Sequence, residues 1–206
     1  MDDTLFDVEG WIAEEIGMEF ALQEGSAFLI GNGTSKPKGI TAYTTAATAD
    51  ASRTFGQVEH LATGVAGDFP SSDKGDILIQ LTHKLRTAYR RGASFIMDTD
   101  LISEVRQFKD GNNQYLWRAG LADGTPNTIL GYAYHEMPDM PAKAANSLSI
   151  GFGNWKRGYT IVDRFGTRVL RDPYTNKPNV AFYATKRVGG GIVNDQAIKL
   201  LRFATS

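Results

Sequence analysis

Cysteine is absent from this 206-residue chain. The absence excludes disulfides, thiolate nucleophiles and cysteine-ligated zinc or iron–sulfur sites. An excess of one charge is also lacking, since 22 Lys and Arg residues balance 23 Asp and Glu residues. A near-neutral chain has no global basic field to gather nucleic acid, so a dedicated DNA-binding protein is not expected.

Long apolar runs are missing as well. No stretch approaches the roughly 20 apolar residues of a membrane span, and residues 1–4 are acidic rather than basic. We therefore expect neither a membrane partner nor an export signal. With 42% hydrophobic residues, the chain can bury one sizeable core or two small ones.

A long amphipathic helix is predicted over residues 5–29, where apolar residues recur every four positions and glycines follow the last turn. The same segment holds five glutamates, including Glu14 and Glu15, and no lysine or arginine. Two interpretations stay open. The glutamates are simply solvated, or they form a docking face for a basic neighbour.

Further helices are predicted in the first half of the chain. Residues 41–52 read as a loop or linker, and a Thr-x-x-Gln capping box at Thr54 predicts a short helix over residues 55–66. Asp76 is expected to open a helix that ends near Gly92. A buried strand over residues 93–98 and a helix capped by Asp100 follow.

Strands dominate the last third of the chain. Strands are expected over residues 128–134, 148–152, 159–163, 167–170, 180–188 and 197–203, with polar loop 120–127 before them and a bend or bulge at residues 189–191. Helices first and strands later indicate an α+β protein rather than alternating βαβ units.

No recognisable chemistry emerges from the motifs. His60, His83 and His135 are far apart, and none stands in a metal-binding spacing. Asp98 and Asp100 are better explained as a strand end and a helix cap than as a carboxylate pair. The sequence thus predicts no catalytic, cofactor-binding or metal-binding residue, and no enzyme.

Four groups of phrases, in order along the chain, resemble the major capsid proteins of tailed bacteriophages. They are EGSAFLIGNGT (24–34) with PKGI (37–40); YRRGASFIMD (89–98) with FKDGNNQYLW (108–117); LGY (130–132), MPDM (137–140), FGNW (152–155) and RGY (157–159); and IVDRFGTRVLRDPYTNKP (161–178), TKRVGGG (185–191) and AIKLL (197–201). Together they cover nearly the whole chain.

The resemblance implies an α+β, HK97-like capsid fold, in which a long spine helix and strands form a peripheral domain beside a mixed α/β axial domain. Residues 1–50 would be the spine helix and connector, 51–158 the axial domain, and 159–206 strands returning through both. The implied function is that of a structural subunit that self-assembles into pentamers and hexamers of an icosahedral phage or prophage shell enclosing DNA.

The resemblance also implies a set of partners and a location. The main partner is the chain itself, with a portal, scaffold or maturation protease as further candidates and packaged DNA contacted only non-specifically. The protein would reside in the virion, and in the host cytoplasm before assembly. No cofactor is implied.

Family members carry an N-terminal arm and an extended hairpin loop before the spine helix, and this sequence starts at that helix. We therefore expect no lysine–asparagine crosslink of the kind that locks some related shells, because the hairpin would supply the lysine. An encapsulin-like shell protein is the alternative within the same fold. A small α+β enzyme is a much weaker alternative.

A basic stretch between two acidic residues supplies the candidate subunit interface. It comprises Arg164, Arg168, Arg171 and Asp172, to which Glu14 and Glu15 of the acidic helix are added. Two interpretations stay open for the arginines, which either form an interface charge network or are solvated strand residues. Loop 120–127 is expected to contact neighbours near the capsomer axis.

Overall fold

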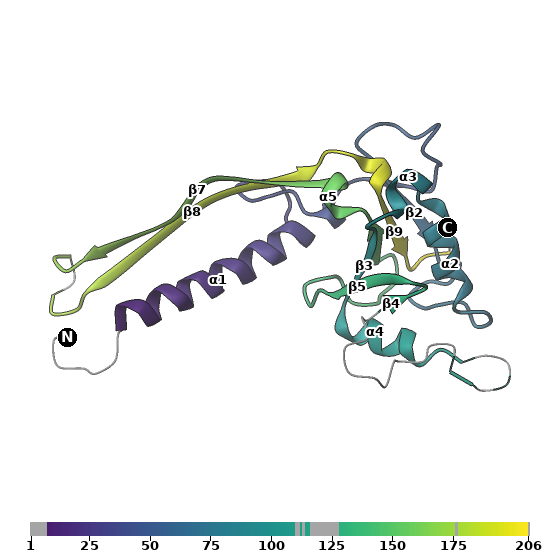
Figure 1. Cartoon of the computed structure of the whole chain (residues 1–206), viewed down its shortest axis with the longest axis horizontal. Helices are drawn as coiled ribbons and strands as arrows, with labels where there is room; N and C mark the ends of the chain where they lie inside the picture. The colour runs from purple at the N-terminus through teal and green to yellow at the C-terminus, as the bar shows by residue number, and fades with distance from the viewer. Residues whose placement is uncertain (1–7, 110–111, 113, 116–127, 176, 206) are drawn as a thin grey trace.

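A computed structural model of the chain describes residues 8–109, 112, 114–115, 128–175 and 177–205. Figure 1 shows a head built around a sheet and a long arm that extends from it. The arm consists of helix α1 (Val8–Ile30) and the paired strands β7 (Tyr159–Asp172) and β8 (Ala181–Ile192). The expected α+β class is confirmed.

The head is organised by a mixed seven-stranded sheet in the order β1-β2-β9-β6-β3-β5-β4. Its strands are β1 (Thr45–Ala46), β2 (Val58–Ala62), β3 (Ser94–Met97), β4 (Thr128–Ile129), β5 (Tyr132–Glu136), β6 (Leu148–Gly153) and β9 (Ile198–Arg202). The C-terminal strand β9 lies between β2 and β6, so the chain returns from the arm into the middle of the head.

Short helices complete the head. They are α2 (Asp76–Lys84), α3 (Thr87–Arg90), α4 (Thr99–Arg106) and α5 (Trp155–Gly158), with 3₁₀ turns η1 (Ile40–Ala42) and η2 (Asp195–Ala197). Buried side chains of α2 and α4 pack with Phe95 and Phe152 of the sheet in one core cluster. A second cluster joins Leu29, at the end of α1, to Ile198 and Leu200 of β9. Burial of these apolar side chains is what holds the arm helix to the head.

The predicted helix over residues 55–66 is wrong. Residues 58–62 form β2, which pairs in parallel with β1 and β9. Gly56 before it has a positive φ of 87°, which ends any helical turn that the capping-box pattern would start. Pairing with β9, about 140 residues later in the chain, decides the structure of this segment.

The predicted helix from Asp76 to Gly92 is in fact two helices, because the backbone of Leu85 is extended between α2 and α3. Arg90 stabilises the break. Its guanidinium donates to the carbonyl oxygens of Leu85 at 2.8 Å and His83 at 2.9 Å. Carbonyls at the end of α2 therefore obtain partners from a side chain instead of from further helical turns.

Two smaller predictions need correction. Asp98, not Asp100, occupies the N-cap position of α4, and Asp100 lies in its first turn. The predicted strand over residues 128–134 is a tight hairpin, because Leu130 and Gly131 both have positive φ and connect β4 to β5. The predicted loop 120–127 lies outside the described residues.

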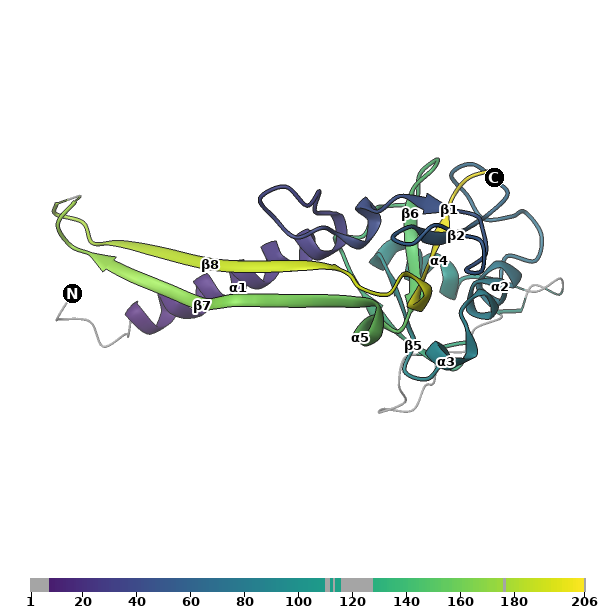
Figure 2. The same cartoon turned by 90° about the horizontal axis from the view of Figure 1, so that it is seen from above.

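The arm strands form one long hairpin rather than several short strands. β7 spans both predicted strands 159–163 and 167–170, and β8 continues through the glycines at 189–191, where a bend or bulge was expected. Figure 2 shows both strands running along α1 for most of its length. Among the described residues, none of the helices combines the length and apolarity needed to cross a bilayer.

Candidate assembly site

The two faces of the arm hairpin differ in exposure. Along β8, the odd-numbered residues 181–187 are exposed and the even-numbered ones are half-buried. Residues that face each other across antiparallel strands point to the same side of the ribbon. Leu170 lies opposite Tyr183, Arg168 opposite Thr185, and Phe165 opposite Arg187. These six residues therefore form the outer face of the hairpin, and Arg187 also borders the groove between the hairpin and α1.

The outer face of the hairpin combines cationic and apolar groups. The guanidinium of Arg168 lies 4.7 Å from the centre of the Phe165 ring, which also attracts Arg164 at 5.6 Å. Leu170 and Tyr183 are 63% and 66% exposed. Large apolar side chains seldom gather on a free surface without a partner, so this face has the composition of an interaction surface.

The inner face of the hairpin covers the second half of α1. Lys186 forms a 2.6 Å ion pair with Glu24 of the helix and approaches Asp163 at 3.7 Å. An open groove of about 660 Å³ between the helix and the hairpin is lined by Phe20, Ala27, Val162 and Val188 together with polar side chains. The arm therefore has only a thin interior of its own.

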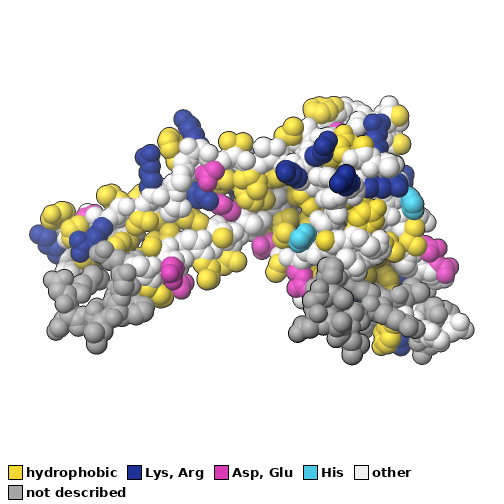
Figure 3. Space-filling view, in the orientation of Figure 1, with side chains coloured by type: hydrophobic (Ala, Val, Ile, Leu, Met, Phe, Trp, Pro, Cys, Tyr) yellow, Lys and Arg dark blue, Asp and Glu magenta, His cyan; other side chains and the backbone are white. Residues whose placement is uncertain are grey.

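The free face of α1 is acidic and apolar. Trp11, Met18 and Leu22 are 50%, 63% and 59% exposed, and their spacing of seven and four positions places them on one side of the helix. Glu14 and Glu15 are exposed in the same part of the helix. Figure 3 shows several Lys and Arg side chains along the upper edge of the arm and acidic side chains both near its middle and on its lower edge.

The structure places the predicted interface residues on the two sides of the arm. Arg164, Arg168 and Arg171 are exposed in β7. Asp172 serves a local purpose, because its carboxylate accepts hydrogen bonds from the side chain of Thr175 and from the backbone N–H of Tyr174 at 2.9 Å. These hydrogen bonds, that from Thr175 first, hold the pKa of the Asp172 carboxyl below its usual value.

Close packing holds α1, β7 and β8 together at the base of the arm, around Gly190. A Cβ atom at this position would lie 2.6 Å from the Tyr159 hydroxyl and 3.1 Å from the Phe28 ring, so a side chain there requires its neighbours to shift. The Tyr159 hydroxyl donates to the Lys38 carbonyl at 2.9 Å, and Tyr43 accepts from the Ile192 N–H at 2.9 Å. Burial, with the nearby Tyr43, raises the pKa of Tyr159 to about 12.

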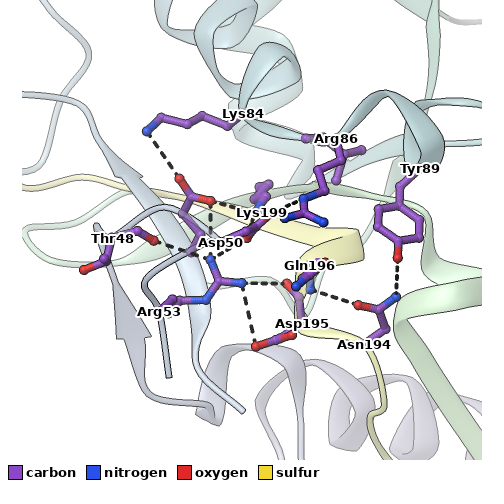
Figure 4. A network of polar contacts seen from close by, with 12 residues as sticks. Thr48, Asp50, Arg53, Lys84, Arg86, Tyr89, Asn194, Asp195, Gln196 and Lys199 are labelled. Carbon is purple, nitrogen blue, oxygen red and sulfur yellow. Dashed lines mark hydrogen bonds and ion pairs between the residues drawn. The ribbon is translucent and has the colours of Figure 1, made fainter. Parts of the chain in front are cut away.

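A buried charge cluster in the head escaped the sequence analysis. Lys199 of β9, 1% exposed, lies 2.5 Å from Asp50 and 2.6 Å from Glu59. Arg53, also 1% exposed, lies 2.7 Å from Asp50 and 3.7 Å from Asp195. Figure 4 shows Asp50, Arg53, Asp195 and Lys199 converging from the 43–57 segment, η2 and β9. The cluster ties the 43–57 segment to β9, an interior strand of the sheet.

A signal for this cluster existed in the sequence. Lys199 interrupts the apolar run from Ala197 to Leu201, and a lysine inside a buried strand requires a carboxylate partner. Which carboxylates would meet it depends on loop placement, which no local pattern reveals. Lys84 and Arg86 close the cluster at its rim, 3.3 Å from Glu59 and 3.5 Å from Asp50.

Histidine and acidic side chains are the groups among the described residues that could share a metal site. Among them, no group of three or more His, Asp or Glu side chains is arranged to hold a metal ion. The three histidines do not converge: His60 is buried in β2, whereas His83 and His135 are exposed on α2 and β5.

Comparison with solved structures identifies similar architectures. Two chains, described as the capsid of an empty and of a native GTA particle computed with C5 symmetry, are each 43% identical to this chain, with a TM-score of 0.90. Each match covers 98% of this chain and 68% of the capsid chain. A Gordonia phage Cozz chain shares the fold at 15% identity and a TM-score of 0.53, over 96% of this chain and 64% of that chain.

Comparison with family models and curated proteins gives two results. No curated protein matches the chain significantly. The model of the phage capsid family matches residues 1–203. The chain therefore belongs to the phage capsid family, as its sequence phrases predicted, and has the HK97-like fold of a structural capsid subunit.

Proposed function

We propose that this chain assembles with copies of itself into rings of five and six subunits that close an icosahedral phage-like shell around DNA. The observation that carries the proposal is the match of 98% of the chain, at 43% identity, to capsid chains described with C5 symmetry. A ring with cyclic symmetry needs two different, complementary surfaces on each subunit. The arm offers two such surfaces.

In this proposal the arm acts as the peripheral domain and the head as the axial domain. With the expected boundaries at residues 50 and 158, the first segment would supply α1 and a connector that contributes β1 to the head sheet, and the last would supply the arm hairpin and β9. Strand β9 supports a close connection between the two parts, because it follows β8 and the short turn η2 in the chain and is an interior strand of the head sheet.

The chain's contribution to the shell would be structural, without catalysis and without a cofactor. The family is one of capsid proteins, which supports this part of the proposal. DNA would be contacted without sequence preference, through phosphates. A portal, a scaffold and a maturation protease are proposed as further partners, in the virion and in the host cytoplasm before assembly.

Native mass across a range of concentrations tests this function. Light scattering and electron microscopy of the purified chain should show pentamers, hexamers or shells above a threshold concentration. In a test variant, Trp11 and Leu170 are replaced by Ser and the buried Lys199 is left unchanged. This variant should begin to assemble only at a higher protein concentration, because both substituted side chains are exposed apolar groups of the arm. A monomer at every concentration and salt condition would overturn the proposal.

A further inference from the structure

The arm separates its charges between its two components. Helix α1 carries five glutamates and no basic residue, whereas β7 and β8 together carry five basic residues and two aspartates. In the part of the arm that the structure describes, Lys186 and Glu24 form a 2.6 Å ion pair across this boundary.

Both α1 and the β7–β8 hairpin also expose large apolar side chains next to their charged ones. Trp11, Met18 and Leu22 are at least half exposed on the free side of the helix, next to Glu14 and Glu15. On the opposite side of the arm, the outer face of the hairpin exposes Phe165, Leu170 and Tyr183 next to Arg168 and Arg187. One surface is acidic and apolar, and the other is basic and apolar.

The acidic surface of α1 and the basic surface of the hairpin are placed so that each can contact a different adjacent subunit in a shell. Figure 1 views the molecule down its shortest axis, and in that view the helix and the hairpin lie side by side. A shell subunit that lies flat in its layer presents such surfaces to two different neighbours. A cyclic ring requires this head-to-tail relation, in which one surface of each copy contacts the other surface of the next.

We propose that the acidic free face of α1 in one copy docks against the basic outer face of the β7–β8 hairpin in a neighbouring copy. This inference rests on the proposed function and assigns the surfaces through which it operates. Exposed apolar side chains of both surfaces would be buried in the contact, and the opposite charges would select the register. The partner is a second copy, because one chain carries both complementary surfaces.

Charge reversal with complementation tests the docking. The helix variant carries E14R and E15R, and the hairpin variant carries R168E and R187E. Because each change introduces like charges into the contact, we expect either variant alone to self-associate at least about tenfold more weakly than the unmodified chain. An equimolar mixture should regain part of the lost association, since each reversed surface then meets its complement. Sedimentation velocity measures all four samples.

Matched controls carry the same change of net charge on the head. E136K with D139K matches the helix variant, and R91E with K156E matches the hairpin variant; all four residues are exposed. These controls should associate like the unmodified chain. Circular dichroism of every variant verifies the fold, and the neutral variants E14Q/E15Q and R168Q/R187Q should give intermediate affinities.

Different failures of this test have different meanings. If the unmodified chain assembles and both reversal variants assemble equally well, the docking is overturned while the proposed function stands. If both variants weaken but their mixture regains nothing, the helix-to-hairpin pairing is overturned. If the hairpin reversal lowers retention of double-stranded DNA and leaves self-association unchanged, that face binds nucleic acid instead. A monomeric unmodified chain would overturn the proposed function itself.

Discussion

Lys199 Nζ lies 2.6 Å from Glu59 Oε2 on the neighbouring strand, with both side chains almost fully buried. Their strands pair in parallel, and residue 59 faces residue 199 directly in the register. Isolated charges are costly to bury, so this pair persists because Asp50 and Arg53 complete it. The cluster makes the position of the 43–57 loop part of the core of the head.

Replacing Lys199 by Met should destabilise the chain strongly. The change leaves the buried carboxylate of Glu59 without its closest cation, and breaking a buried pair in this way costs about 3 kcal/mol or more. Urea denaturation followed by circular dichroism measures the loss. The matched control is K84A at the rim of the same cluster, where Lys84 is 41% exposed and the expected cost stays below about 1 kcal/mol. Equal losses in the two variants would contradict this prediction.

Asp50 should contribute stability that disappears in acid. Burial alone would raise the pKa of its carboxyl, but hydrogen bonds and charges from Lys199 and Arg53 outweigh burial and lower it. A lowered pKa means that the stabilisation is complete above the unfolded value of about 3.9 and is lost as the pH falls through the folded value. D50N should therefore be less stable at pH 7 and lose less stability below about pH 4. Parallel acid-denaturation curves would refute the assignment.

His60 should weaken the fold at mildly acidic pH. Burial, aided by the charge of Arg202 and opposed by Glu59, lowers its pKa. Among the described residues, its Nδ1 atom has no hydrogen-bond partner. Because the unfolded chain binds this proton more readily, stability falls as the pH drops below about 6.5, by at most about 1.4 kcal/mol per pH unit.

The variant H60Q tests this prediction, whatever its effect at neutral pH. The difference between its unfolding free energies at pH 7.5 and pH 5.5 should be smaller than that of the unmodified chain. H83Q, a change at an exposed histidine, serves as the control and should retain the pH dependence. An unchanged difference in H60Q would show that another group is responsible.

Some segments could be predicted from sequence because local patterns and tertiary contacts agree. The α1 periodicity continues to residue 30, and the apolar run at residues 94–97 is a fully buried strand. The prediction for residues 58–62 was wrong because the spacing of Val58 and Leu61 fits a helix as well as a strand. Pairing with β9 makes the segment a strand. The arginines of β7 were recognisable as an unusual cluster. That these arginines lie apart from the acidic surface of α1 could not be predicted from the sequence, because it depends on the pairing register of β7 and β8.

A side chain at residue 190 should destabilise the arm. In G190A the new Cβ would approach the Tyr159 hydroxyl and the Phe28 ring, so β7 and α1 must shift relative to β8, at a cost of about 1–3 kcal/mol. G166A is the control, because a Cβ at residue 166 meets nothing within 4 Å. Thermal unfolding and the rate of proteolysis within the arm measure the difference. A G190A variant as stable as G166A would remove the argument for a close-packed joint.

The length of the hairpin gives the joint at Gly190 a mechanical consequence. Fourteen residues of β7, at about 3.3 Å each, extend roughly 46 Å from the joint. A rotation of only about 5° at its base would move the tip by about 4 Å, close to the spacing of neighbouring strands. The position of the hairpin tip therefore depends on the packing of a few atoms around Tyr159 and Phe28 at its base. Small adjustments there set how far apart two neighbouring arms can reach.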